Sequence, residues 1–537
     1  MRLSWLRDLV LLTLGVLLVL PVAMVLGSWL EWNPQSTQIL GAMASTVLPQ
    51  YAWTSLVLCV AVGVGVTLVG TATAACVTLF DFAGRRSFEW LLLLPLAMPA
   101  YVVAYAYTDF LQFSGPLQGW LRASFGWEGR VFPEIRSVGG AVWVFVFVLY
   151  PYVYLLARAA FSERAVHLME AARLLGAPLA RRLRSVALPL ARPAVAAGVA
   201  LALMETLADF GVASYFGIQT FTTGIFKAWL AMDDRIASAQ LATSLLVVVA
   251  LLLALEHRAQ RRVRFASARG GRGRSPEAEP VVLRGRHVAL AWGVCGLPVL
   301  AGFLLPVLFM LRPLAADWSV LPWSRFMEWG WNSVRLGALS AGLAVLLSLG
   351  LAFNLRRRRN PVTRGVARLV ALGYAVPGAV IVIGLLLPLA WLQQAAPQTS
   401  AGYWITGTVL GVVWAYLVRF TSVALQSVQS GYARIPVSFD DTARMLGVDR
   451  LALLRRVHWP LLKRSVAAAG LLVFVDVMKE LPATMLLRPF NTDTLAVVAY
   501  QLARDERLGE AALPSLALVL VGLLPVLLLS RTLRSRR

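Results

Sequence analysis

Long apolar runs recur along nearly the whole chain, separated by short charged or Pro/Gly/Asn-rich breaks. A membrane-spanning helix needs about 20 mostly apolar residues, so each run is long enough to cross a bilayer. With 59% hydrophobic and only 14% charged residues, the 537-residue chain lacks the polar surface of an ordinary soluble enzyme. The sequence therefore predicts an all-α polytopic membrane protein with about twelve transmembrane helices. In chain order, the expected spans are 9–30, 53–80, 89–111, 138–160, 193–215, 237–255, 288–311, 334–355, 366–392, 403–426, 465–487 and 511–530.

The distribution of positive charge predicts the orientation. The formal net charge of +23 would suit a nucleic-acid partner, but most of the 50 Lys and Arg residues fall in alternate loops and in the two tails. This is the positive-inside pattern, and it predicts that both termini are cytoplasmic. Nucleic acid is therefore not expected as a partner. The basic run at 356–359 is expected to face anionic membrane lipid, and the first apolar run is interpreted as a retained anchor.

The two halves of the chain repeat each other. Residues 169–176 match residues 440–447 at an offset of 271, and the same offset places Leu188-Pro189 on Trp459-Pro460. Each half has six expected spans in the same orientation, which predicts two parallel repeats with the substrate pathway between them. The expected parts are a first permease repeat, an Arg/Gly-rich cytoplasmic linker and a second permease repeat, at 1–256, 257–286 and 287–537.

Each half has one long cytoplasmic loop between its fourth and fifth spans, at 162–191 and 430–463. Apolar residues at helical spacing predict a short helix at the start of each loop, lying outside the membrane. The first of these helices is expected to end at Gly176 and the second at Gly447, because glycine readily takes the left-handed conformation that ends a helix.

A second short helix is expected later in each loop. In the first loop it begins near Pro178 and is expected to end at Leu188-Pro189. In the second loop Asp449 is the expected cap of this helix, and Pro460 is the expected break. Each loop is therefore predicted to fold as a helix-turn-helix.

Glu170-Ala171-Ala172, together with Gly176 and the later Leu188-Pro189, resembles the Glu-Ala-Ala loop of ATP-binding-cassette importer permeases. In that family the loop forms a coupling helix that docks into a cleft on a cytoplasmic ATPase. The second copy has Asp441-Thr442-Ala443 instead of Glu-Ala-Ala, which keeps a carboxylate. The residues that the resemblance assigns to coupling are Glu170, Ala171, Gly176, Asp441, Ala443 and Gly447.

The resemblance implies that the chain is a transport subunit of the bacterial inner membrane and not an enzyme. A phosphate-binding Walker A loop needs Gly-Lys-Ser/Thr, but the only lysines, Lys227, Lys463 and Lys479, follow Phe, Leu and Met. ATP is thus expected on a separate homodimeric ATPase, with no cofactor bound by this chain, and a periplasmic binding protein is expected to deliver substrate. Major-facilitator secondary transporters are the competing class, since residues 81–86 resemble part of their signature.

Three further segments, at 150–158, 204–211 and 478–484, resemble the fused two-domain permeases of ferric-iron importers. This resemblance covers nearly all of the chain and implies ferric iron as substrate. Related permeases for thiamine, phosphonate and polyamine share the cytoplasmic loops. These substrates therefore remain alternatives.

Four carboxylates lie within the expected spans: Glu205, Asp209, Asp476 and Glu480. Each pair has i, i+4 spacing, which would put both acids on one helix face about 6 Å apart along the axis. An acid inside a membrane normally faces a partner or a wet cavity, and carboxylate oxygens suit a hard metal ion. We therefore expect all four on the substrate pathway, with Glu205 and Asp209 as transient metal ligands.

Two alternatives remain open for these residues. The acids would instead stabilise the helix bundle if they paired with Lys479, Arg419 or backbone donors, and for Glu480 this role has equal weight. Tyr101 and Tyr105 follow Pro99 in the third span and would add phenolate oxygens to the pathway. Such residues also form the aromatic belt at the membrane interface.

Overall fold

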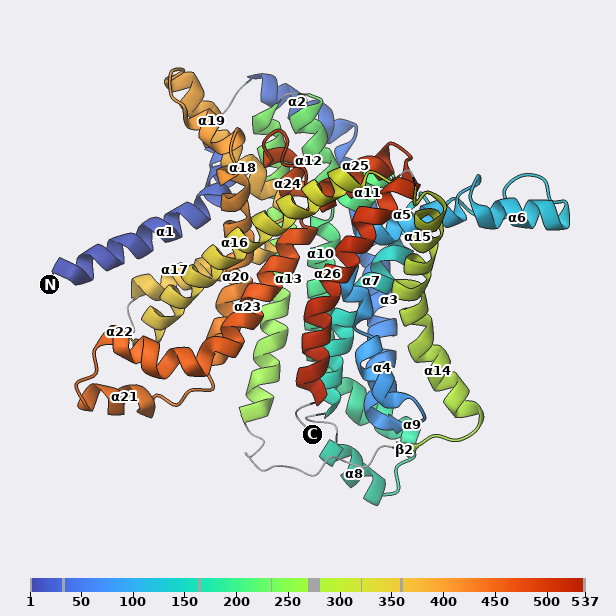
Figure 1. Ribbon diagram of the computed structural model, residues 1–537. Helices are drawn as coiled ribbons and strands as arrows, with labels where there is room; N and C mark the ends of the chain where they lie inside the picture. The colour runs from blue at the N-terminus through green and yellow to red at the C-terminus, as the bar shows by residue number, and fades with distance from the viewer. Residues whose placement is uncertain are drawn as a thin grey trace. The chain divides into compact units, whose positions relative to one another are not determined.

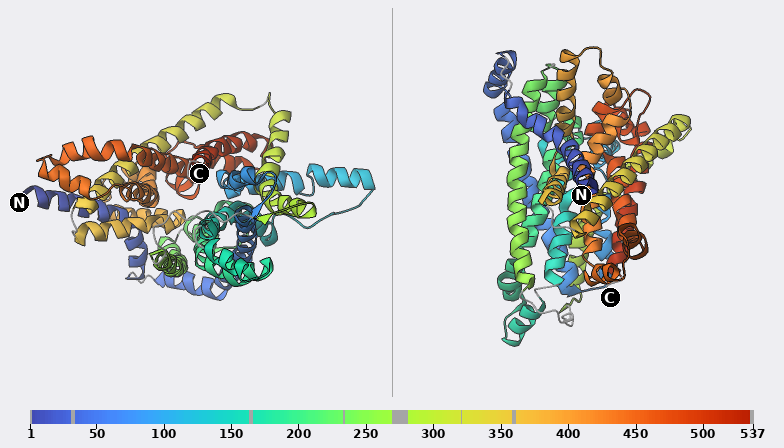
Figure 2. Two further views of the ribbon diagram at one scale, coloured as in Figure 1. Left: turned by 90° about the horizontal axis from the view of Figure 1, so that it is seen from below. Right: turned by 90° about the vertical axis from the view of Figure 1, so that its left-hand side faces the viewer.

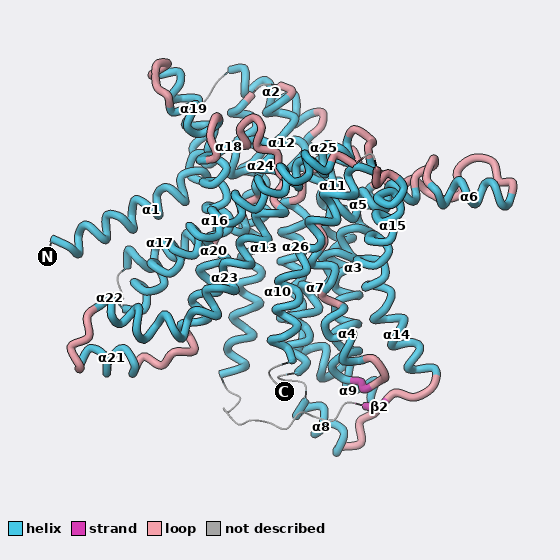
Figure 3. The backbone as a smooth tube through the Cα atoms, viewed as in Figure 1, coloured by secondary structure: helices cyan, strands magenta, loops and turns pink. Residues whose placement is uncertain are grey.

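The computed structural model describes residues 2–30, 34–162, 166–232, 234–268, 281–319, 321–357 and 361–534 (Figure 1). The described part is almost entirely helical, and its only strands are β1 (Phe80–Asp81) and β2 (Val281–Val282), which pair in parallel (Figure 3). The all-α prediction is confirmed.

The α-helices of residues 2–268 are α1 (Arg2–Gly27), α2 (Pro34–Ser45), α3 (Leu48–Leu79), α4 (Arg85–Leu91), α5 (Ala100–Leu111), α6 (Pro116–Phe125), α7 (Val138–Ala160), α8 (Val166–Leu174), α9 (Leu179–Arg182), α10 (Leu188–Ala208), α11 (Gly211–Tyr215), α12 (Phe221–Leu230) and α13 (Arg235–Ala268). Those of residues 286–534 are α14 (Arg286–Val299), α15 (Leu305–Ala316), α16 (Trp323–Arg357), α17 (Pro361–Ala371), α18 (Gly378–Ala395), α19 (Ala401–Thr406), α20 (Leu410–Tyr432), α21 (Ser438–Met445), α22 (Arg450–Ala452), α23 (Trp459–Lys479), α24 (Pro482–Leu487), α25 (Leu495–Arg504) and α26 (Leu508–Arg534).

Ten helices in the described residues are long and apolar enough to cross a membrane. An eleventh candidate is a bent pair, Arg85–Ala97 with Ala100–Phe125, whose parts meet at 89°. The expected span at 465–487 corresponds to α23, which carries Lys463, Arg464 and Asp476 and is too charged to qualify by composition. The polytopic architecture is thus confirmed, but the count of twelve spans is not.

The described chain forms two compact units, and each unit combines segments from both halves of the sequence. The first unit comprises Met1–Leu40, Ile225–Thr243 and Pro322–Val498. The second unit comprises Gly41–Gly224, Ser244–Leu321 and Ala499–Arg537.

In the first unit, α1 packs along α17 and α18, which belong to the other half of the sequence (Figure 2). The indole Nε1 of Trp414 donates a hydrogen bond of 2.9 Å to the carbonyl of Leu17. A Cβ at Gly384 would lie 1.9 Å from the carbonyl oxygen of Pro21, so the close approach of α18 to α1 requires glycine there. The first helix of the chain is thereby tied to the second repeat.

The second unit contains the converse exchange. Here α15 packs against α5 and α26. The Tyr107 hydroxyl on α5 donates a 2.7 Å hydrogen bond to the carbonyl of Ala301, which lies in the π-helical turn just before α15. The first helical segment of each half therefore packs on helices of the other half.

The expected helix breaks at Leu188-Pro189 and at Pro460 are wrong. The chain is helical from α9 through a π-helical turn (Leu183–Ala187) into α10, and Leu179–Ala208 counts as one candidate span. In the second repeat, α22 runs through a second π-helical turn (Leu453–His458) into α23. A π-turn shifts the backbone hydrogen bonds by one residue. A proline near this turn, which has no N–H to donate, therefore fits the helix without breaking it.

Candidate functional site

The short helices of the loops at 162–191 and 430–463 end as the sequence predicts. Gly176 has φ +77° and Gly447 has φ +69°, both in the left-handed region. After α8, the N–H of Ala177 donates to the carbonyl of Ala172 at 3.0 Å, and after α21 Val448 donates to Ala443 at 3.0 Å. This six-to-one bond is the Schellman pattern that closes a helix around a left-handed glycine.

Each of these helices presents two large apolar side chains to solvent just before its glycine. Leu174 and Leu175 are 89% and 87% exposed, and the equivalent Met445 and Leu446 are 90% and 76% exposed. Adjacent exposed apolar side chains of this kind are typical of a docking surface.

The other residues assigned to coupling lie around these apolar pairs. Ala443 is buried, whereas Ala171 and Asp441 are exposed. The backbone of Glu170 lies in α8, but its side chain is outside the described part. The expected cap is present, since Asp449 Oδ1 accepts a 2.7 Å hydrogen bond from the N–H of Ala452.

The expectation that Glu205 and Asp209 share a face of one helix is wrong. The helix α10 ends at Ala208, and Asp209 lies in extended backbone at the break before α11. Its Oδ1 accepts a 2.8 Å hydrogen bond from the N–H of Val212, so Asp209 caps α11. Electrostatic interaction still connects the two carboxylates. The break therefore puts the two acids in different backbone settings, with Glu205 inside α10 and Asp209 just past its end.

Four tyrosines surround this break, and we call Tyr101, Tyr105, Tyr215 and Tyr500 the tyrosine cluster. The ring centroids of Tyr105 lie 5.6 Å from those of Tyr101 and 4.7 Å from those of Tyr215. The Tyr500 ring centroid lies 5.9 Å from that of Phe210, the residue after Asp209. The Tyr105 hydroxyl is buried and has no hydrogen-bond partner among the described residues.

Backbone packing holds the tyrosine cluster together. A Cβ at Gly211 would lie 2.7 Å from the Cβ of Tyr101, so α11 approaches α5 as closely as glycine allows. The Tyr500 hydroxyl lies 2.8 Å from the Ser214 hydroxyl. The structure thus joins the predicted Tyr101, Tyr105, Glu205 and Asp209, and it adds Tyr215 and Tyr500, which the sequence reasoning missed.

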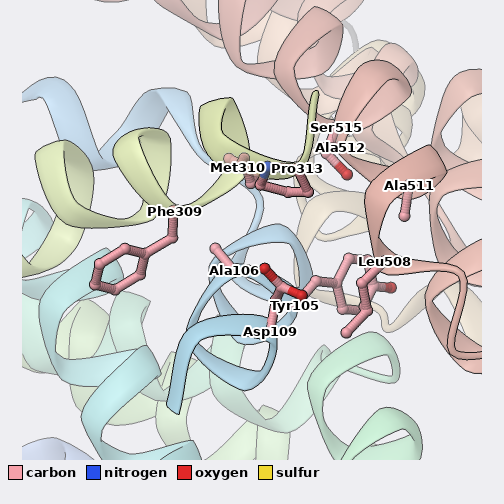
Figure 4. Close-up of a pocket in the computed structure, with 10 residues that line it drawn as sticks. All are labelled: Tyr105, Ala106, Asp109, Phe309, Met310, Pro313, Leu508, Ala511, Ala512 and Ser515. Atoms are coloured by element: carbon pink, nitrogen blue, oxygen red, sulfur yellow. The ribbon is translucent and has the colours of Figure 1, made fainter. Parts of the chain in front are cut away.

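A small cavity lies beside Tyr105, between α5, α15 and α26 of the second unit (Figure 4). Its volume is about 10 Å³, which is close to the space that one water molecule needs. Figure 4 shows the Asp109 carboxylate and the Ser515 hydroxyl pointing into this space. Asp109 Oδ2 and Ser515 Oγ are buried and have no hydrogen-bond partner in the described part of the chain. Oxygen atoms that could form hydrogen bonds with a bound water or substrate therefore extend from the tyrosine cluster into this cavity.

The second predicted acid pair has a different environment. The helix α23 ends at Lys479, so Glu480 also lies at a helix break and does not share a helix face with Asp476. Glu480 Oε1 lies 3.3 Å from Arg419 Nη1, and Oε2 accepts 3.1 Å hydrogen bonds from the N–H groups of Ala483 and Thr484. The Glu480 side chain is 2% exposed. This ion pair is the arrangement expected of a residue that stabilises the bundle.

No group of three or more His, Cys, Asp and Glu side chains among the described residues could hold a metal ion. A metal ion held by Glu205 and Asp209 would therefore need further ligands, and the hydroxyls of the tyrosine cluster are oxygen atoms of a suitable kind.

Two segments of the chain, residues 66–265 and 344–535, match the family described as binding-protein-dependent transport system inner membrane component. The chain belongs to this family. It is the membrane permease of an ATP-binding-cassette importer and not a catalytic subunit, and the major-facilitator alternative is set aside. Membership implies a partner ATPase that binds ATP and a substrate-binding protein.

The relatives whose names include a substrate share only about a quarter of their residues with this chain. The chain is 25% identical to the Fe(3+)-transport system permease protein FbpB 2 of Haemophilus influenzae, over 89% of this chain and 88% of the relative. It is 23% identical to the ferric transport system permease protein FbpB of Actinobacillus pleuropneumoniae, over 83% of this chain and 65% of the relative. A putative 2-aminoethylphosphonate transport system permease protein, PhnV of Salmonella typhimurium, is 27% identical over 37% of this chain and 72% of the relative.

Proposed function

We propose that this permease moves ferric iron, delivered by a periplasmic binding protein, into the cytoplasm. The observation that carries the proposal is the tyrosine cluster around Asp209, with Glu205 nearby. Ferric ion is a hard cation that prefers carboxylate and phenolate oxygens. In this proposal Glu205, Asp209, Tyr101 and Tyr105 are transient ligands. Tyr105 contributes a buried hydroxyl that has no hydrogen-bond partner among the described residues.

Similarity to relatives supports the same substrate. The relative named for Fe(3+) transport aligns along nearly the whole chain, whereas the relative named for 2-aminoethylphosphonate aligns with little more than a third of it. A phosphonate is an anion, and its binding would call for unpaired basic groups at the helix breaks. Asp209 and the tyrosine cluster offer oxygen atoms instead. The Arg136 guanidinium, which donates a 3.4 Å hydrogen bond to the Tyr215 hydroxyl, is already paired with Glu506 at 3.2 Å.

The two cytoplasmic loops complete the proposed mechanism. In it, α8 and α21 are coupling helices that dock onto a homodimeric cytoplasmic ATPase through Leu174-Leu175 and Met445-Leu446. ATP binding would bring the ATPase subunits together and, through the two loops, switch the pathway from inward-facing to outward-facing. Both termini are cytoplasmic in this arrangement. We assign Glu480 to bundle stability, because its carboxylate is already occupied by Arg419 and by backbone donors.

The experiment is uptake by the complete importer in proteoliposomes, comparing ferric iron with thiamine, 2-aminoethylphosphonate and a polyamine on the cognate binding protein. ATP-dependent accumulation of iron alone is the expected result. Accumulation of one of the organic substrates without iron would overturn the proposal and leave the class of permease intact.

A further inference from the structure

A cluster of charged side chains joins the second cytoplasmic loop to the helices of the first unit. Asp440 on α21 lies between Arg356, near the end of α16, and His458, in the π-helical turn before α23. Arg356 Nε is 2.6 Å from Asp440 Oδ2, and His458 Nε2 is 2.8 Å from Asp440 Oδ1. We call Arg356, Asp440 and His458 the loop lock.

The loop lock is buried and fully hydrogen-bonded. The side chains of Arg356, Asp440 and His458 are 9%, 2% and 0% exposed. Arg356 also donates to the carbonyls of Tyr432, at 2.9 Å, and Ile435, at 3.0 Å, so its guanidinium connects α20, α21 and α16. A buried charge without such partners would be strongly destabilising. The three side chains are therefore held in one arrangement by their mutual hydrogen bonds.

The charge state of Asp440 agrees with this role. Burial raises the pKa of the Asp440 carboxyl, but hydrogen bonds from Arg356 and His458 outweigh the effect of burial and hold this pKa below its ordinary value. Asp440 is therefore ionised at neutral pH. Charge-assisted hydrogen bonds to an ionised carboxylate are shorter and more directional than neutral ones.

The positions of the first cytoplasmic loop that correspond to Asp440 and His458 carry apolar residues. At the offset of 271, Met169 replaces Asp440 and Ala187 replaces His458, and both are buried, at 8% and 0% exposure. Arg85 replaces Arg356. It donates to the carbonyl of Val77 at 2.7 Å and pairs with Asp81 at 3.7 Å and Glu89 at 3.9 Å, four residues away on either side. An apolar contact has no preferred direction, so it tolerates sliding that a network of charged hydrogen bonds resists.

We infer that Arg356, Asp440 and His458 are positioning residues that make α21 move as one body with the ends of α16 and α23, whereas the equivalent positions Met169 and Ala187 of the first loop offer only apolar contacts. The inference rests on the proposed docking of α21 onto the ATPase. The helix α23 then carries the movement of α21 directly to Glu480 and Arg419 at its far end. The two coupling helices would thus transmit the ATPase movement unequally.

The test compares Asp440→Asn with Asp440→Glu in the assembled importer with its ATPase and binding protein. Substrate transported per ATP hydrolysed should fall at least about fivefold in Asp440→Asn, the lower end of an allosteric coupling. Asp440→Glu keeps the carboxylate, so its ratio of substrate transported to ATP hydrolysed should fall less than that of Asp440→Asn. The matched control in the other loop is Met169→Leu, which conserves volume and should leave the ratio unchanged.

Hydrogen exchange of the same complexes gives a second readout that does not depend on the substrate. Amides of 438–445 should exchange more slowly than those of 166–174 in the unmodified complex, and Asp440→Asn should remove this difference. A variant that loses thermal stability but keeps both the ratio and the slow exchange would overturn the inference. Failure of Leu446→Ser to weaken ATPase association would instead contradict the docking in the proposed function.

Discussion

The two repeats break the same helix at the same place but surround the break with different chemistry. In the first repeat α10 ends at Ala208 and Asp209 caps α11, and in the second repeat α23 ends at Lys479 and Glu480 caps α24. Asp209 is bordered by tyrosines and a second acid, whereas Glu480 is paired with Arg419. Duplication has therefore conserved a backbone device, a carboxylate that caps a broken helix, while the charge around it has diverged.

This contrast assigns different tasks to the two acids. A carboxylate that already has a guanidinium partner gains little from a passing cation, and its loss leaves a buried charge. A carboxylate among neutral oxygens is available to a cation. The comparison predicts that substitutions at one break change stability and that substitutions at the other change transport.

The largest effect is expected from Arg419→Met. This change leaves Glu480 buried without its cation, and breaking a buried ion pair costs about 3–5 kcal/mol. Thermal unfolding of the detergent-purified permease, together with the amount inserted in the membrane, measures the loss. Glu205→Gln is the matched control, because it removes an acid near the other break. Equal stability of Arg419→Met and the unmodified protein would contradict the structural role of the pair.

The next largest effect is expected from Asp209→Asn, and it concerns transport. Asparagine caps a helix as well as aspartate does, so the hydrogen bond to the N–H of Val212 survives and the stability should change by less than about 1 kcal/mol. ATP-dependent iron uptake should fall more than about tenfold, equivalent to about 1.4 kcal/mol in the transition state. Normal uptake by a stable variant would remove Asp209 from the pathway and favour an organic substrate.

A smaller effect is expected from Gly176→Val and Gly447→Val. A left-handed residue other than glycine costs about 1–2 kcal/mol, and neither site has atoms within 4 Å that would clash with a new Cβ. Both variants should stay inserted and lose transport several-fold, as measured by uptake per ATP hydrolysed. Because α21 is held by the loop lock and the equivalent positions of the first loop are apolar, Gly447→Val should have the larger effect. Unchanged transport and ATPase association in both would show that these helix ends are not needed for coupling.

Local signals in the sequence were sufficient for some of these features. Gly176 and Gly447 follow short runs with helical spacing, and Asp449 precedes a helix start, so each is decided by its immediate neighbours. The long apolar runs likewise predicted the polytopic class. The break at Asp209 was not predictable in this way, because the apolar run continues through it and the i, i+4 spacing assumed an unbroken helix.

Contacts between distant segments account for most of what the sequence did not reveal. Tyr500 reaches the tyrosine cluster from the other half of the chain, and no pattern around it marks the meeting. Arg356 belongs to a basic run that was expected to face lipid, yet its guanidinium is buried against Asp440. Pro189 was expected to break a helix. That prediction was wrong because the π-helical turn that accommodates the proline has no simple sequence signature.

The packing of α1 on α17 and α18 also sets an order of events during biosynthesis. These partners are encoded some 330 to 370 residues after α1, and a ribosome adds about 5–20 residues per second. The helix α1 is therefore in the bilayer for about 20–70 s before these two partners exist. A helix in that position has to be stable in lipid alone, and the stretch Leu12–Leu30 carries no charged residue. Its final docking onto Gly384 is then a late step, in which the newly made second repeat binds a helix that was synthesised some 330 to 370 residues earlier.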